Sequence, residues 1–189
     1  AAAQLPPLTQ CSPTLIPVFN ATCGSVNNWA YIKSLTTSGG MTNITNNNTN
    51  CGNTATSYSD YTGTSMLVKQ TAFSSVDVKI TWTGNNGNNI RTTLNRIYVD
   101  WNRDGDFADL GEYIAPGTFT GTHPHSQNNN TTLTIKVTVP GYAKEGLTRM
   151  RVITSARNFI YDPSGTACNG VYGEAEDYTF EVINPCLAP

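Results

Sequence analysis

Charged side chains are scarce in this sequence of 189 residues: they make up 13% of it, against roughly 25% in an average soluble domain. Lys and Arg together number 11 and Asp and Glu 13, which gives a formal net charge of −2. So even a balance offers no electrostatic reason to expect nucleic acid or an anionic membrane as a partner. Asn, Thr, Ser and Gly replace the charges, a composition typical of extracellular all-β proteins. We therefore expect a secreted protein.

Long apolar runs and catalytic motifs are also lacking. No stretch approaches the roughly 20 apolar residues of a membrane span, so we predict none. There is no Gly-x-Ser-x-Gly, no His-Glu-x-x-His and no phosphate-binding glycine loop before a helix. The two histidines, His123 and His125, share one Gly/Thr/Asn-rich loop, either as surface residues or as two ligands of a transition metal. We expect a protein that is not an enzyme.

The five cysteines show no Cys-x-x-Cys spacing, which disfavours a zinc ribbon or a thioredoxin-type site. Two disulfides with one cysteine left over would imply an oxidising compartment, in agreement with secretion. Five reduced, buried thiols are the alternative. The cysteines are Cys11, Cys23, Cys51, Cys168 and Cys186.

No long stretch keeps the 3.6-residue apolar period of a helix, and Tyr142–Gly146 allows at most one turn. Short alternating runs separated by Gly, Asn and Pro predict strands instead. We therefore predict an all-β fold, an antiparallel β-sandwich of jelly-roll or immunoglobulin-like type. The expected strands cover residues 29–36, 65–73, 76–82, 94–102, 133–139, 148–153 and 178–182, with a short one around 41–44.

The length suits a single domain with one core. Pro6 and Pro7 lie in a segment with little capacity for regular strand pairing, so we expect an extended N-terminal tail. The predicted division is a Pro-rich tail at residues 1–10, a β-sandwich at residues 11–183 and a C-terminal tail at residues 184–189.

Five carboxylates fall within the thirteen residues 100–112, which begin inside the expected strand 94–102 and continue past its end. Oxygen-bearing side chains at every second position, followed by Gly105, suit a loop around a hard cation such as Ca²⁺. Counted from Asp100, Gly111 occupies the twelfth position of the loop, where the helix–loop–helix calcium motif requires an acid. A solvated Asp/Gly turn without a cation is therefore the alternative. The predicted ligands are Asp100, Asn102, Asp104, Asp106, Asp109 and Glu112.

A second acidic motif consists of Glu174, Glu176 and Asp177. On a strand, the two glutamates face one way and Asp177 the other. Three interpretations are open. The carboxylates pair with Arg149 and Arg151, which we take as the default; they complete the cation site; or Glu174 forms a glycosidase pair with Glu112.

Four motifs occur in a fixed order. They are Tyr58-Ser59-Asp60-Tyr61-Thr62, Val99-Asp100-Trp101-Asn102-Arg103-Asp104-Gly105-Asp106-Phe107, Gly146-Leu147-Thr148-Arg149-Met150-Arg151-Val152 and Gly173-Glu174-Ala175-Glu176-Asp177-Tyr178-Thr179. Together they resemble the GEVED domain, a module of large secreted bacterial proteins. The resemblance covers roughly Cys11–Ile183, and Ala175 stands where the family has valine.

The resemblance implies a non-catalytic β-sandwich of the kind carried by extracellular peptidases, glycoside hydrolases and adhesins. It also implies calcium in the acidic loop. Family members often carry a cysteine near the start and another before the final motif, which implies the pairs Cys11–Cys168 and Cys23–Cys51, with Cys186 left over.

Three classes of function follow. The first is a calcium-stabilised module for adhesion that binds a glycan or a cell-surface polymer. Trp29, Trp82 and Trp101 are candidates for stacking on sugar rings. Trp82 and Trp101, however, lie on apolar strand faces, which favours a place in the core. The second is a structural subunit of an extracellular filament or layer, whose N-terminal tail docks into another copy. A hydrolase is a distant third.

Overall fold

The computed structural model describes most of the β-sandwich and parts of the segments around it. The residues that the structure describes are 5, 14–15, 31–49, 58–63, 65–83, 93–114, 131–156, 167–171 and 173–184. Over these ranges the secondary structure is all strand, turn and bend. The predicted all-β class is confirmed. No helix in this part of the chain has the length and apolar character needed to cross a membrane.

The strands follow one another along the chain with short turns at one end. Their bounds are β1 (Thr14–Leu15), β2 (Tyr31–Ser38), β3 (Thr45–Asn46), β4 (Tyr58–Asp60), β5 (Leu67–Thr71), β6 (Ser75–Thr83), β7 (Thr93–Val99), β8 (Tyr113–Ile114), β9 (Thr131–Thr138), β10 (Gly146–Ala156), β11 (Asn169–Val171) and β12 (Gly173–Ile183).

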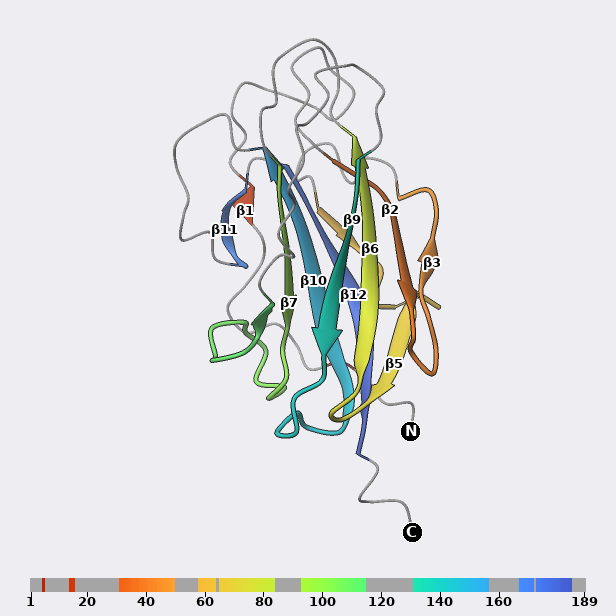
Figure 1. Ribbon diagram of the computed structural model, residues 1–189. Helices are drawn as coiled ribbons and strands as arrows, with labels where there is room; N and C mark the ends of the chain where they lie inside the picture. The colour runs from red at the N-terminus through yellow and green to blue at the C-terminus, as the bar shows by residue number, and fades with distance from the viewer. Residues whose placement is uncertain are drawn as a thin grey trace.

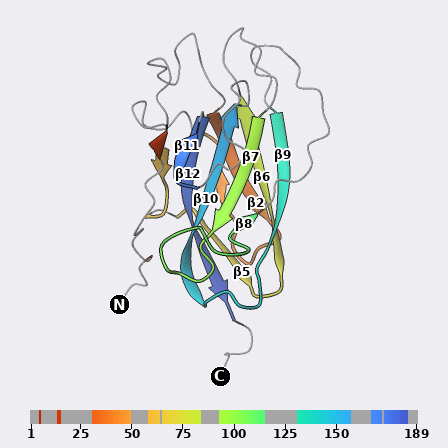
Figure 2. The same cartoon turned by 90° about the vertical axis from the view of Figure 1, so that its left-hand side faces the viewer.

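Two sheets face each other and form the sandwich (Figures 1 and 2). The first has the order β3-β2-β6-β9 and is antiparallel throughout. The second has the order β4-β12-β10-β7-β8, with β5 also paired to β12. The strands β1 and β11 form a separate parallel pair. The predicted sandwich is therefore confirmed.

The second sheet is mixed, so the prediction of purely antiparallel sheets is wrong for this sheet. β12 runs antiparallel to β10, but β4 and β5 both lie parallel to β12 along its other edge. Neither β4 nor β5 is joined to β12 by a hairpin, since more than 100 residues separate them in the sequence. Alternating side chains predict a strand equally well in either direction, so the sequence pattern leaves the direction of pairing undetermined.

The core lies between the two sheets and is filled by the alternating apolar residues. Val76, Val78, Ile80 and Trp82 of β6 all point inward, as the alternation predicts. Trp101 packs edge-on against Phe180 of β12, with ring centroids 5.2 Å apart. Trp82 and Trp101 are both buried, which confirms the core interpretation and removes them as sugar-stacking candidates. Trp29 lies outside the described residues.

Several strand boundaries differ from the predicted ones. β10 and β12 each run over eleven residues, longer than expected, because they pair with each other from Gly146 with Val182 to Ser155 with Gly173. The short strand expected around 41–44 occurs instead at Thr45–Asn46, and Thr42 makes an isolated bridge to Lys69.

Candidate functional site

The acidic loop, residues 100–112, connects β7 to β8 at one end of the sandwich (Figure 1). Tyr113 and Ile114 return beside β7, and the Val99 N–H donates to the carbonyl of Glu112 over 2.9 Å. The buried Trp101 side chain donates from Nε1 to the carbonyl of Gly111 over 3.1 Å. The loop therefore closes on itself and is anchored in the core through its tryptophan.

Side-chain oxygens of the loop repeatedly accept the N–H two residues ahead. Asn102 Oδ1 accepts from Asp104 N over 2.9 Å, Asp104 Oδ1 from Asp106 N over 3.1 Å, and Asp106 Oδ1 from Ala108 N over 2.8 Å. Such turns suit short polar side chains, which replace backbone partners locally. The chain bends sharply at Gly105, whose φ of 93° favours glycine.

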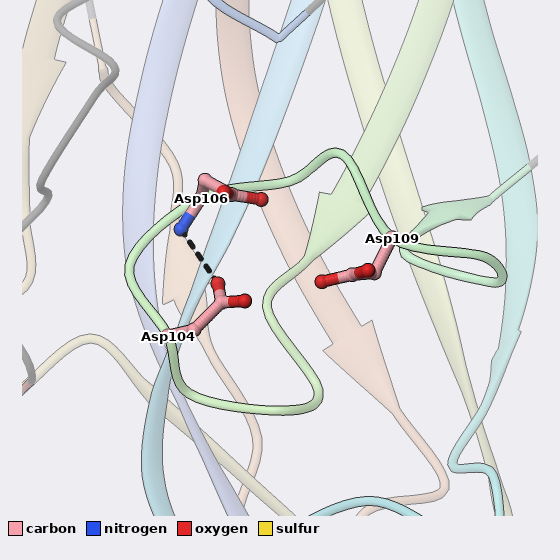
Figure 3. A group of neighbouring side chains, drawn as sticks. All are labelled: Asp104, Asp106 and Asp109. Carbon is pink, nitrogen blue, oxygen red and sulfur yellow. Dashed lines mark hydrogen bonds between the residues drawn. The ribbon is translucent and has the colours of Figure 1, made fainter.

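Asp104, Asp106 and Asp109 come together at the surface of this loop (Figure 3). Their carboxylates each offer an oxygen within 4.8 Å of the others. The amide of Asn102 lies beside them and donates from Nδ2 to Asp104 Oδ2 over 2.8 Å and to Asp109 Oδ2 over 2.5 Å. Slight burial acts to raise the pKa of Asp104, but hydrogen bonds from Asp106 N and the Asn102 amide outweigh it and lower that pKa.

Asp100 and Glu112 are buried below this group and brace the loop backbone. Asp100 accepts from the N–H of Asp104 over 3.2 Å and of Gly105 over 3.1 Å. Glu112 accepts from Asn102 N over 3.4 Å and Asp109 N over 3.3 Å. Burial raises the pKa of Asp100, and burial together with the nearby charges of Asp100 and Asp109 raises that of Glu112 to about 7.

The six predicted ligands thus divide into two groups. Asp104, Asp106 and Asp109 converge, whereas Asp100 and Glu112 are occupied with loop amides. Asn102 turns its donor nitrogen, not its oxygen, toward the acids, so it would have to rotate its amide to become a ligand. A calcium site of all six residues stays a prediction.

Asp177, of the second acidic motif, pairs with both neighbouring arginines, as the default interpretation expects. Its Oδ2 lies 2.9 Å from Arg149 Nη1, and Oδ1 lies 2.7 Å from Arg151 Nε. Arg151 Nη2 adds a second bond of 2.7 Å to Oδ2, and the Tyr58 hydroxyl donates to the same oxygen over 2.8 Å. Burial, and then the Asp177 carboxylate, raise the pKa of Tyr58.

This charged cluster joins all four sequence motifs. The guanidinium of Arg151 lies 5.7 Å from the Tyr58 ring centroid and 5.1 Å from that of Phe107, which belongs to the acidic loop. Asp60 reaches Arg149 at 3.5 Å. Residues of all four motifs, far apart in the sequence, therefore pack into one cluster on the face of β12 that is turned away from the other sheet.

Glu174 and Glu176 lie on the other face of β12, as predicted, and are fully buried. Glu174 Oε2 accepts from the N–H of Ile32 in β2 over 2.8 Å. Glu176 Oε2 accepts from the Tyr178 hydroxyl over 2.7 Å, and its Oε1 is buried without a hydrogen-bond partner. Burial, and then the charge of Glu174, raise the pKa of Glu176 well above its ordinary value.

The cysteine and histidine predictions fall largely outside the described residues. Cys168 is disulfide-bonded and packs beside the cluster of Tyr98 and Phe107. Cys11, Cys23, Cys51 and Cys186 lie outside the described ranges, so the pairs Cys11–Cys168 and Cys23–Cys51 stay predictions. His123 and His125 also lie outside them.

Phe73 and Tyr142, which no sequence pattern singled out as functional, are exposed aromatic residues at the end that carries the acidic loop. Both lie in connections, Phe73 between β5 and β6 and Tyr142 between β9 and β10. The available signal was an aromatic side chain placed among turn residues, Phe73 directly before Ser74-Ser75 and Tyr142 directly after Pro140-Gly141.

Comparison with known families settles the resemblance. Residues 95–181 match the family model of the GEVED domain. The GEVED match runs from β7 through the acidic loop to β12 and includes three of the four motifs; the Tyr58–Thr62 motif lies before it. The resemblance inferred from the motifs is therefore confirmed over these residues.

No curated protein matches this chain. Among solved structures, a Niemann-Pick type C2 protein from the Japanese carpenter ant aligns with a TM-score of 0.43 at 6% identity. The alignment covers 86% of this chain and 98% of that one. A TM-score this low supports no inference about function.

Proposed function

We propose that this GEVED-type β-sandwich is a secreted, non-catalytic adhesion module that binds a glycan or another cell-surface polymer, with Ca²⁺ bound in the acidic loop. The observation that carries the proposal is the internal use of the charged motif residues. Arg151 and Asp177 are fully buried against each other, and Glu174 is engaged with a backbone amide of β2. Groups held in this way are poorly placed to meet a substrate, and the loss of either partner would destabilise the fold.

The donor set of the acidic loop fits a calcium ion. Asp104, Asp106 and Asp109 are the residues that would hold it, because their carboxylate oxygens are hard ligands and already converge within 4.8 Å. Three carboxylates so close together repel one another in the absence of a cation. Bound Ca²⁺ would relieve that repulsion and stabilise the folded loop, since a ligand that binds only the folded state adds to stability.

Calorimetry and thermal unfolding with and without Ca²⁺ test this part of the proposal. We expect a higher melting temperature in Ca²⁺, with a gain of about 2.7 kcal/mol when the ion is at 100 times its Kd. D106N and D109N should lose most of that gain. E145Q removes an exposed acid from the neighbouring connection and should keep it. Absence of any calcium effect on heat or melting would overturn the calcium assignment.

Sedimentation with insoluble polysaccharides tests the binding function. We expect the full chain to sediment with at least one of cellulose, chitin and mannan, and to leave ester and glycoside substrates unchanged. Hydrolysis of any such substrate by the purified chain, lost in E174Q, would instead support the glycosidase alternative.

Assembly is a second candidate function, favoured by one observation. β9 is an edge strand, and among the described residues it pairs only with β6. An exposed edge can accept an extended segment of another copy, for which residues 1–10 are the predicted segment. Light scattering on the full chain and on a version without residues 1–10 distinguishes the two functions: a monomer in both cases excludes assembly through the tail.

A further inference from the structure

Four large apolar side chains are exposed in connections at the end of the sandwich that carries the acidic loop. Phe73 is 76% exposed, Tyr142 61%, Leu110 95% and Met41 63%. They belong to the β5–β6 turn, the β9–β10 connection, the acidic loop and the β2–β3 connection, which lie at the same end in Figure 1. Scattered apolar side chains on a surface are ordinary, but a group of them often marks a contact site.

Contacts link three of them: Phe73 and Tyr142 through Gly141, and Tyr142 and Leu110 through a hydrogen bond. A Cβ at Gly141 would lie 2.2 Å from Cζ of Phe73, so the Phe73 ring rests against the Gly141 backbone, and Tyr142 is the next residue. The Tyr142 hydroxyl donates to the carbonyl of Leu110 over 2.9 Å. A Cβ at Gly111 would lie 2.2 Å from that hydroxyl. We call Phe73, Tyr142 and Leu110 the aromatic ridge.

Phe73 adopts a backbone conformation that a bulky side chain rarely takes, with φ of 65°. The turn is held by two hydrogen bonds of 2.9 Å, from Phe73 N to Val139 O and from Val139 N to Ser74 O. A glycine would fit there without strain. An aromatic side chain that is strained in its backbone and mostly exposed contributes little to folding, which points to a role in contact.

The surroundings of the ridge are polar and carry more acids than bases. Several hydroxyl groups lie close to Phe73 in the chain. Ser75 Oγ and Thr138 Oγ1 form a hydrogen bond of 2.9 Å, and Ser74 Oγ accepts one from Thr71 Oγ1. The charged residues of the acidic loop and the β9–β10 connection that are not buried are the acids Asp104, Asp106, Asp109 and Glu145 and the bases Arg103 and Lys144. Without Ca²⁺ this excess of acids would repel an anionic polymer or membrane, and Ca²⁺ bound as proposed above would balance it. Neither state carries a net positive charge that attracts an anionic ligand.

We propose that the aromatic ridge is the glycan-contact surface of this module and that its ligand is a neutral polysaccharide. The apolar C–H face of a sugar ring packs on an aromatic ring, while its hydroxyls bond to a rim of hydroxyl and backbone groups. This inference rests on the proposed glycan-binding function and adds to it the place and the charge class of the ligand. The exposed rings of Phe73 and Tyr142 take the place of the buried Trp82 and Trp101 as candidates for stacking on a sugar.

Binding to cellulose, chitin and mannan, measured by sedimentation of the full chain, tests the ridge. F73A and Y142A should each weaken binding about tenfold, the effect of one lost apolar contact. G141A keeps both rings but displaces that of Phe73, and it should weaken binding as well. T132A, which shortens an exposed side chain at the opposite end of β9, is the control and should bind as the wild type does.

Stability distinguishes a contact role from a structural one. F73G removes the side chain and relieves the left-handed backbone, so it should bind weakly yet unfold at a temperature no lower than that of the wild type. A clear loss of stability in F73G would mean that the ring supports the fold, and would overturn the inference.

The remaining outcomes separate the inference from the function on which it rests. If the wild type sediments with none of the polysaccharides, the proposed glycan binding itself fails. If the wild type binds and the ridge variants bind equally well, only the ridge is wrong and the function stands. Ridge-dependent binding to phosphatidylcholine–phosphatidylglycerol vesicles, without polysaccharide binding, would identify a membrane contact and overturn the proposal.

Discussion

At the scale of single residues, Asp177 is a fully buried charge that contacts two other strands. It accepts from both Arg149 and Arg151 and from the Tyr58 hydroxyl, and no part of it reaches solvent. Its removal would take this carboxylate from the buried Arg151 and leave Arg149 with the more distant Asp60, which costs far more than the net strength of the original pair. Asp177 therefore holds β4 and β10 to β12.

We predict that D177N lowers the free energy of unfolding by about 3–5 kcal/mol, measured by urea denaturation. The matched control is D60N, because Asp60 contacts the same Arg149 at 3.5 Å but its side chain is 46% exposed. That change should cost less than about 1 kcal/mol, as expected for a solvent-screened pair. Equal losses in the two variants would contradict the special role of Asp177.

Glu176 makes stability depend on pH in the unusual direction for an acid. Burial raises its pKa above 4.5 in the folded state, so above that pH the folded protein holds a proton that the unfolded chain releases. Stability from this group is therefore complete at low pH and is lost as pH rises from the unfolded pKa to the folded one.

We predict that E176Q unfolds at a higher temperature than the wild type by a margin that grows as the pH rises above 4.5. Glutamine keeps an oxygen for the Tyr178 hydroxyl and carries no charge to repel Glu174. E181Q, which removes a partly exposed acid from the same strand, is the control. A margin that shrinks toward high pH would show the opposite sign and refute the assignment.

At the scale of elements, β12 is the strand on which the fold depends. It pairs with β10 over ten residue positions on one side and with β4 and β5 on the other. One of its faces carries Glu174, Glu176 and Tyr178 into the space between the sheets, and the other carries Asp177 to the arginines. The final sequence motif is the N-terminal half of this strand.

We predict that hydrogen exchange, followed by mass spectrometry, is slowest along β10 and β12. Amides in a strand paired on both sides open only with the whole sheet, whereas the two-residue strands β3 and β8 open locally. Exchange in β3 and β8 should therefore be faster by at least tenfold. Equal protection of β8 and β12 would contradict this order.

At the scale of the whole molecule, the two sheets share one core. Residues of the first sheet, such as Val78 and Ile80, belong to the same buried cluster as Tyr178 and Phe180 of the second. Neither sheet can bury its apolar face alone, so we expect them to unfold together.

We predict a single thermal transition in which circular dichroism and tryptophan fluorescence give the same midpoint. Trp82 reports on the first sheet and Trp101 on the second, since each is buried in the shared core. W82F and W101F should each move both signals together. Two separated midpoints would show that the sheets unfold independently.

The sequence by itself determined the class of fold and the position of the acidic loop. Period-two alternation, as in Val76, Val78, Ile80 and Trp82, specifies a strand and its buried face because successive side chains point to opposite sides. Oxygen-bearing residues at every second position before Gly105 specify a turn, because each can accept the N–H two residues on. Both signals are local and need no knowledge of distant contacts.

Only the tertiary structure decided which of those residues meet. Asp104, Asp106 and Asp109 converge while Asp100 and Glu112 turn inward, a division that depends on how β8 folds back on β7. The parallel pairing of β4 and β5 with β12, and the contact of Gly141 with Phe73, likewise join residues far apart in the sequence. Long-range contacts depend on the packing of the whole chain, and no local pattern encodes them.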